Sequence, residues 1–235
     1  MVNNWIEYIQ LKLLPGCCLL CGKLSGKLQD LCPACKSRLP LNDHHCRSCA
    51  QPLPLSTTGG SLCGRCQRNN PLFDHCFAPF RYQDELTSLH HNFKFHHKLA
   101  AGRLMAELMC EQFEAPSRNL PQLLIPVPLH GRRLRERGFN QAQELARILS
   151  ARLSIPIDSH SLCRTRNTTA QSGLPKKERQ RNIRNAFALT AKVASPHVAI
   201  IDDVMTTGLT VNEIAKILRA SGVSEIEIWV FARTP

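Results

Sequence analysis

The sequence predicts an α/β domain preceded by a small cysteine-rich module. Four Cys-x-x-Cys pairs lie within the first 66 residues, and no further pair follows. Towards the other end, a continuous apolar run at 198–201 leads through a Thr/Gly-rich turn into an amphipathic helix expected at about 210–220. A strand of that kind is typical of a sheet covered on both faces. The 235 residues leave room for two units, for which we expect the ranges 1–72 and 73–235.

The charge of the chain is strongly positive, because 30 Lys and Arg stand against 18 Asp and Glu. Such a balance favours anionic partners, either nucleic acid or a phosphorylated metabolite, without choosing between them. No apolar run is long enough to span a bilayer, so we expect no membrane insertion. Trp5, Ile6, Ile9 and Leu13 fall at helical spacing and predict a short amphipathic helix. This segment lacks the features of an export signal, and we expect a cytoplasmic protein.

The paired cysteines have the spacing of zinc ligands. They are Cys18, Cys21, Cys32, Cys35, Cys46, Cys49, Cys63 and Cys66. A two-residue gap lets a tight turn present both thiolates to one ion, and two such turns complete a tetrahedral shell. We therefore expect two closed, structural Zn²⁺ sites, which supply folding energy to a module with little core. Consecutive pairs can share an ion, or a cross-braced arrangement can join the first pair with the third and the second with the fourth.

The other cysteines and the histidines are interpreted as lying outside these sites. Cys17 adjoins the first pair and could replace a ligand, whereas Cys76, Cys110 and Cys163 are isolated and typical of small buried hydrophobes. We expect a group of histidines to be solvated or to face nucleic acid. They are His44, His45, His75, His90, His91, His96 and His97.

The turn after the apolar run has the composition of a phosphate site. Asp202 and Asp203 come first, and the residues that follow Val204 are Met205, Thr206, Thr207, Gly208, Leu209 and Thr210. A loop between a strand and a helix N-terminus offers free N–H groups and the positive end of the helix dipole. Glycine lets the backbone approach a phosphate, and threonine adds hydroxyl donors. Two adjacent carboxylates suit the neighbouring hydroxyls of a ribose.

Positive charge is concentrated in the middle of the chain. Residues 126–185 hold 13 Lys and Arg against four acids. Arg133 and Arg137 would share one face of a helix, but Gly138 favours a loop there. Arginines beside a phosphate site are candidates to clamp a pyrophosphate as it leaves, and Arg137 is the strongest of them. A helix is expected at 139–153, and the polar stretch 171–184 is either a flap over the ligand or a nucleic-acid contact.

Several of these segments resemble those of known families. The run IIDDVMTTGLT resembles the 5-phosphoribosyl-1-pyrophosphate (PRPP) signature of type I phosphoribosyltransferases. The segments IPVPL and RLRERGFNQA look like the core of the competence protein F (ComF/GntX) family. The same order of parts includes Phe93-Lys94-Phe95, the Thr-Arg-x-Thr-x-x-Gln stretch at 165–171 and Arg181-Asn182. This resemblance covers nearly the whole chain, and the doubled cysteine module is similar to that of the GntX branch.

The resemblance carries expectations about fold and function. It implies a type I phosphoribosyltransferase-like, mainly parallel sheet flanked by helices and preceded by a zinc-ribbon module. It implies that Asp202 and Asp203 hold the ribose hydroxyls, that 205–210 wrap the 5′-phosphate, and that Mg²⁺ binds with PRPP. It also implies natural competence or the use of external DNA as a nutrient, which connects to nucleoside metabolism. Single- or double-stranded DNA and proteins of DNA uptake would then be partners.

Two functions fit these observations. One is a phosphoribosyltransferase that displaces pyrophosphate from PRPP, with an acceptor that no purine or pyrimidine pocket in the sequence identifies. The other is a nucleic-acid-binding protein whose PRPP site is regulatory or non-catalytic, because one fold serves many functions.

Overall fold

The computed structural model describes residues 16–25, 30–58, 60–113, 119–168 and 181–235. The amphipathic helix expected near the N-terminus and the part 171–180 of the polar stretch lie outside the described residues. Among the helices that are described, none is long and apolar enough to cross a membrane.

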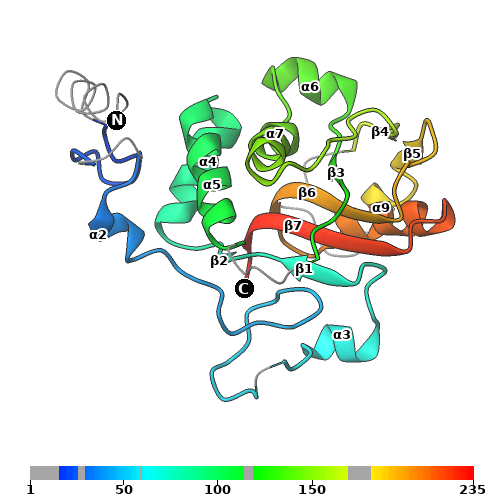
Figure 1. Cartoon of the computed structure of the whole chain (residues 1–235), viewed down its shortest axis with the longest axis horizontal. Helices are drawn as coiled ribbons and strands as arrows, with labels where there is room; N and C mark the ends of the chain where they lie inside the picture. Colours follow the sequence, from blue (N-terminus) through cyan, green and yellow to red (C-terminus); the bar gives the residue numbers. More distant parts are fainter. Residues whose placement is uncertain (1–15, 26–29, 59, 114–118, 169–180) are drawn as a thin grey trace.

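A parallel sheet forms the centre of the described chain, with helices on both faces (Figure 1). In chain order the elements are α2 (Pro33–Lys36), α3 (Gly64–Arg68), β1 (His75–Phe77), β2 (Phe80–Arg81), α4 (Glu85–Phe95), α5 (Leu99–Glu111), β3 (Leu123–Pro126), α6 (Gly131–Arg137), α7 (Gln141–Leu153), β4 (Leu162–Arg164), β5 (Phe187–Leu189), β6 (His197–Met205), α9 (Leu209–Ala220) and β7 (Glu225–Arg233). The strand order is β1-β7-β6-β3, with β2 also beside β7, and every pair in this sheet is parallel. Strands β4 and β5 form a separate antiparallel pair. The predicted α/β class with a mainly parallel sheet is confirmed.

The central strands β6 and β7 are almost entirely buried because helices cover both of their faces. Ile200 and Ile201 are fully buried and pair in register with Ile228 and Trp229. Strand β6 extends beyond the apolar run expected at 198–201 and includes both acids. Since side chains alternate along a strand, the two neighbouring acids project to opposite faces of the sheet.

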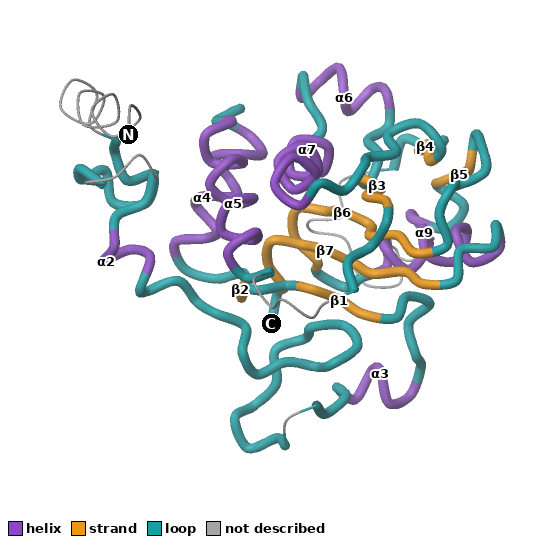
Figure 2. Tube along the Cα trace, in the orientation of Figure 1, coloured by secondary structure: helices purple, strands orange, loops and turns teal. Residues whose placement is uncertain are grey.

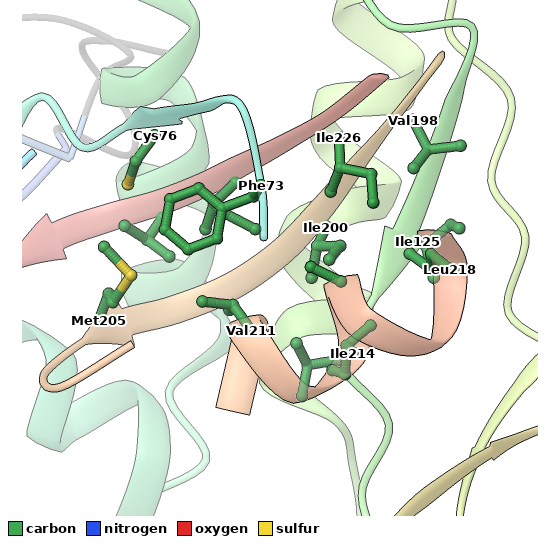
Figure 3. Packing of buried hydrophobic residues seen from close by; sticks show 14 of the residues in the cluster. Phe73, Cys76, Ile125, Val198, Ile200, Met205, Val211, Ile214, Leu218 and Ile226 are labelled. Atoms are coloured by element: carbon green, nitrogen blue, oxygen red, sulfur yellow. The ribbon is translucent and has the colours of Figure 1, made fainter. Parts of the chain in front are cut away.

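Each face of the sheet has its own apolar cluster. On one face, Val211 and Ile214 of α9 pack with Ile200 of β6, as Figure 3 shows. On the other face, α4, α5 and α7 pack over Ile201 and Trp229.

The two cysteine modules divide between these clusters. We call residues 16–39 the first module and 42–68 the second. Cys18 and Cys32 of the first belong to the cluster under α4, α5 and α7, whereas all four paired cysteines of the second belong to the cluster under α9. The second module is mostly loop around α3 and lies beside β1 (Figure 2). Each module thus extends a different core.

Two of the expected helices are confirmed, and one expected loop is wrong. Helix α9 begins one residue before the expected start, and α7 lies within the helix expected at 139–153. The loop expected around Arg133 is instead the short helix α6. His130 caps its first turn, and Gly138 takes a left-handed conformation at φ 72° just after its end. A glycine in this conformation ends the helix that precedes it. Gly138 therefore marks the end of α6 and does not argue against a helix before it.

Candidate phosphoribosyl site

The predicted phosphate turn connects the carboxyl end of β6 to the first residue of α9. Gly208 adopts φ 72° at this junction, a conformation that favours glycine. A Cβ added there would lie 3.4 Å from the Met205 Sδ atom, which is close contact on the strand side. The turn therefore brings backbone N–H groups and a helix N-terminus together at the carboxyl edge of the sheet, where open α/β sheets bind ligands.

Asp203 is held in a buried network on the α4 face. Its Oδ2 atom lies 2.8 Å from His90 Nε2 and 3.3 Å from Lys94 Nζ, and the Tyr82 hydroxyl lies 3.0 Å from His90 Nδ1. Its Oδ1 atom accepts a hydrogen bond of 2.7 Å from the Val204 N–H. Burial by itself would raise the pKa of Asp203, but Lys94 and His90 outweigh it and hold the pKa well below its ordinary value. Asp203 is therefore a charged, positioned acceptor.

Asp202 has a different environment on the opposite face. Its Oδ1 atom accepts a hydrogen bond of 2.9 Å from the Asp203 N–H, and its side chain is half-buried. Burial and the charge of Asp203 raise the pKa of Asp202. Two acids that are adjacent in the sequence therefore differ in their partners and in the direction in which their pKa values are shifted.

Three arginines share the electrostatic field of these acids. Burial lowers the pKa of Arg137, while the charge of Asp203 opposes that effect and the charge of Arg133 adds to it. Burial also lowers the pKa of Arg164 on β4. The charge of Asp202 opposes this lowering, and the charges of Arg133 and Arg137 add to it. Like charges that disfavour one another in this way are typical of a site that receives an anion.

Each of these guanidinium groups is also partly fixed by protein contacts. Arg137 donates to Gln141 Oε1 at 3.0 Å and lies over the ring of Phe95, with its Cζ atom 5.9 Å from the ring centroid. Arg133 pairs with Glu136 at 3.2 Å on the exposed side of α6. Arg164 stacks over Phe187 at 5.5 Å. A helix rather than a loop presents Arg133 and Arg137, and their role as a pyrophosphate clamp stays a prediction.

Several residues of this site were missed in the sequence. His90 is only 6% exposed, so the interpretation of it as solvated or facing nucleic acid is wrong. Lys94 lies in the Phe-Lys-Phe segment and one helical turn after His90, which was the available signal. No local sequence pattern marks Arg164, nor does one mark Arg65 and Arg233 on the outer side of the turn.

The outer side of the turn faces the second cysteine module. A pocket of about 440 Å³ lies between them. Its lining residues are Gln51, Cys63, Arg65, Thr206, Thr207, Arg233, Thr234 and Pro235. The turn residues Thr206 and Thr207 therefore share one cavity with residues of the second module.

The paired cysteines form two tetrads in consecutive order. One tetrad is Cys18, Cys21, Cys32 and Cys35, and the other is Cys46, Cys49, Cys63 and Cys66, with the four sulfurs of each within 4.8 Å of one another. The cross-braced alternative is excluded by this grouping. A tetrahedral ion with Zn–S bonds of about 2.3 Å needs sulfurs about 3.8 Å apart. The distance is 3.8 Å from Cys21 Sγ to Cys32 Sγ and 3.7 Å from Cys49 Sγ to Cys63 Sγ, so both tetrads fit zinc.

The unpaired cysteines differ from one another in burial. Cys76 is buried, as expected of a small hydrophobe, whereas Cys110 and Cys163 are only half-buried. Cys17 is exposed and stands outside the first tetrad.

Comparison with known proteins assigns both parts of the chain. Residues 10–67 match the double zinc ribbon domain, and residues 134–235 match the phosphoribosyl transferase domain. Competence protein F of Haemophilus influenzae is 36% identical, over 92% of this chain and 96% of that protein. The chain belongs to the competence protein F (ComF/GntX) family. Within that family, the DNA utilization protein YhgH of Shigella flexneri is 34% identical over 94% of this chain and 98% of its own length. Competence protein ComFC of Streptococcus pneumoniae is 22% identical over 92% of this chain and 99% of that protein.

Proposed function

We propose that this family member binds PRPP at the carboxyl edge of the sheet. The observation that carries the proposal is the strand–turn–helix at 197–220, whose two acids lie within the electrostatic influence of Arg137 and Arg164. The turn 205–210 receives the 5′-phosphate on its N–H groups and threonine hydroxyls. Asp202 and Asp203 accept hydrogen bonds from the ribose hydroxyls. Asp203 can do so while bonded to His90 and Lys94, because a carboxylate has about four acceptor sites.

The arginines Arg133, Arg137 and Arg164 bind the pyrophosphate in this proposal. As the bond from ribose C1′ to pyrophosphate breaks, negative charge grows on the departing oxygens. Guanidinium groups that bind the departing oxygens bidentately stabilise this charge. Arg137 is suited to this role, because Gln141 and the ring of Phe95 hold it in place.

Mg²⁺ would enter with PRPP. The carboxyl group of Asp202, which has to lose its proton when the ion binds because its pKa is raised, would supply the hard oxygen ligands that this ion prefers. When bound, the ion adds positive charge beside the pyrophosphate. The residues of the chain still have to orient the ribose and exclude alternative positions for the leaving group.

A second role, binding of DNA in the cytoplasm, is favoured by the distribution of charge. Residues 126–185 carry most of the positive excess, and curated relatives are called competence and DNA utilization proteins. Cysteine thiolate tetrads are typical of proteins kept in a reducing compartment. In this alternative the PRPP site regulates DNA binding or a protein of DNA uptake, and transfer does not occur.

Calorimetric titration with PRPP, with and without Mg²⁺, tests the binding proposal. We expect saturable binding of one ligand per chain that weakens in Arg137→Gln. Arg147→Gln is the matched control, because Arg147 lies on the exposed side of α7 and pairs only locally with Glu144 at 2.8 Å. Equal affinities in wild type and Arg137→Gln would contradict the assignment. Release of pyrophosphate in the presence of nucleobases then separates transfer from binding alone.

A further inference from the structure

Arg233, the last residue of β7, joins the second cysteine module to the phosphate turn. Its side chain is only 1% exposed. Towards the module, its Nε donates to the Cys49 carbonyl at 3.2 Å and its Nη2 donates to Gln51 Oε1 at 2.5 Å. Towards the turn, its Nη1 donates to the Met205 carbonyl at 2.9 Å and to the Thr206 carbonyl. A buried guanidinium is tolerated where its donors are used, and here they bridge a zinc ligand and the turn.

Arg65 makes a second connection from inside a Cys-x-x-Cys turn. It lies between Cys63 and Cys66, and its Nη1 donates to the Thr207 carbonyl. A Cβ added to Gly208 would lie 3.8 Å from Arg65 Nη2, so this side chain lies directly against the turn. Together the two arginines bind three consecutive carbonyls, those of residues 205, 206 and 207.

These contacts determine where the N–H groups of the turn point. In a planar trans peptide, the carbonyl of one residue and the N–H of the next point in opposite directions. No cis peptide bond occurs in the described residues. Carbonyls 205 and 206 point to Arg233 and carbonyl 207 points to Arg65, so the N–H groups of residues 206, 207 and 208 point away from these two guanidinium groups. Those are the groups that the proposed function assigns to the 5′-phosphate.

The described residues of the first module show a different kind of connection. Their side-chain ties to the body include Lys36 to Glu111 at 2.9 Å, Arg38 to Glu85 at 3.0 Å, and Asp30 to Arg103 at 2.5 Å. All three pairs end on α4 or α5, and within the described parts of the chain none of them reaches residues 205–208.

We propose that the second cysteine tetrad is a scaffold for the phosphate turn, with Arg65 and Arg233 as the positioning residues that transmit its geometry. The proposal rests on the proposed function, because it assigns PRPP to this turn. Zinc at the second tetrad sets the affinity for PRPP, whereas zinc at the first tetrad does not. When the second module is folded, the N–H groups of the turn already point towards the position of the 5′-phosphate. When the module is loosened, the turn has to become ordered as the ligand binds, which lowers the affinity.

The test measures three quantities on each full-length variant: PRPP–Mg²⁺ affinity by calorimetry, zinc content, and hydrogen exchange of the amides of residues 206–208. We expect Arg65→Gln to keep both zinc ions, to weaken PRPP binding by about five- to thirtyfold, and to speed exchange in the turn. Arg65→Lys retains one donor and restores part of the affinity. Arg38→Gln, the matched control on the first module, keeps wild-type affinity and exchange.

Two cysteine variants complete the test. Cys63→Ser should lose one zinc and weaken PRPP binding more than Arg65→Gln does, while Cys21→Ser should lose one zinc and leave PRPP affinity within about twofold of wild type. If Cys63→Ser fails to fold, the comparison of Arg65→Gln with Arg38→Gln decides. Wild-type affinity and exchange in Arg65→Gln would overturn the scaffold. A wild type that binds no PRPP would instead refute the proposed function, and exchange in the turn would still show whether the module holds it.

Discussion

The two cysteine modules are nearly interchangeable as sequence patterns, yet they are attached to the protein in different ways. Exposed and half-exposed ion pairs connect the first to α4 and α5. Buried guanidinium-to-carbonyl bonds connect the second to the phosphate turn. Surface ion pairs contribute about 0–1 kcal/mol each, whereas hydrogen bonds to charged groups contribute about 1.5–3 kcal/mol. One motif can therefore serve as a peripheral module or as part of a binding site, and its attachment decides which.

The largest expected effect is on stability after loss of a zinc ligand. Structural zinc binding is worth on the order of 10 kcal/mol in small modules, so each tetrad should depend on its ion. Cys32→Ser should unfold the first module and leave the sheet domain folded. Cys63→Ser should also lower the melting temperature of the sheet domain, because its tetrad belongs to the cluster under α9.

Elemental analysis and calorimetric melting check this difference. About two zinc ions per wild-type chain and about one per variant are expected. A zinc-free protein whose melting is unchanged by a chelator would contradict both zinc assignments, and identical melting of the two variants would remove the difference between the modules.

A second prediction concerns the α4 side of the sheet, to which the first module is attached. The pKa of Asp203 lies below its ordinary value near 3.8, so its interactions stabilise the native state above that pH. That contribution is lost progressively as the pH falls below about 3.8 towards the native pKa. Asp203→Asn should unfold more easily at pH 6 by about 1–3 kcal/mol and lose less stability on acidification than wild type.

Urea titrations across pH 3–6 measure this effect. Arg38→Gln serves as the control, because it cuts the first module's ion pair to α4 without touching Asp203. We expect it to follow the wild-type pH dependence. If it changes the acid response as much as Asp203→Asn does, the first module also positions the site and the comparison fails.

A third prediction asks whether DNA uses either module. Log affinity for DNA should fall with log salt, because each neutralised phosphate releases counterions. Replacing Lys176, Lys177 and Arg179, which lie outside the described residues, with Gln should flatten that slope by about two to three units. PRPP affinity should be nearly intact. Arg137→Gln should instead weaken PRPP binding more than DNA binding. Loss of both PRPP and DNA binding in both variants would indicate one shared anion cleft.

The sequence predicted those parts of the site that depend on local patterns. Two examples are the spacing of Cys18 and Cys21 and the pair of acids that precedes Gly208. Each of these patterns spans only a few residues. The contacts that assemble the site join distant residues: His90 and Asp203 are 113 positions apart, and Cys49 and Arg233 are 184 apart. Periodicity and spacing contain no information about such pairs. No sequence pattern marks Arg233, although its burial makes it a central contact.

The smallest but most direct effect comes from one hydroxyl of the turn. Thr207→Val keeps the size of the side chain and removes a donor that the account assigns to the 5′-phosphate. Thr190→Val is the control, since that hydroxyl donates to the His160 carbonyl at the end of the β4–β5 pair. Calorimetric titration with PRPP–Mg²⁺ should show affinity weakened by about 1–2 kcal/mol in Thr207→Val and unchanged in Thr190→Val. Equal PRPP affinity in wild type and Thr207→Val would show that the phosphate does not bind in this turn.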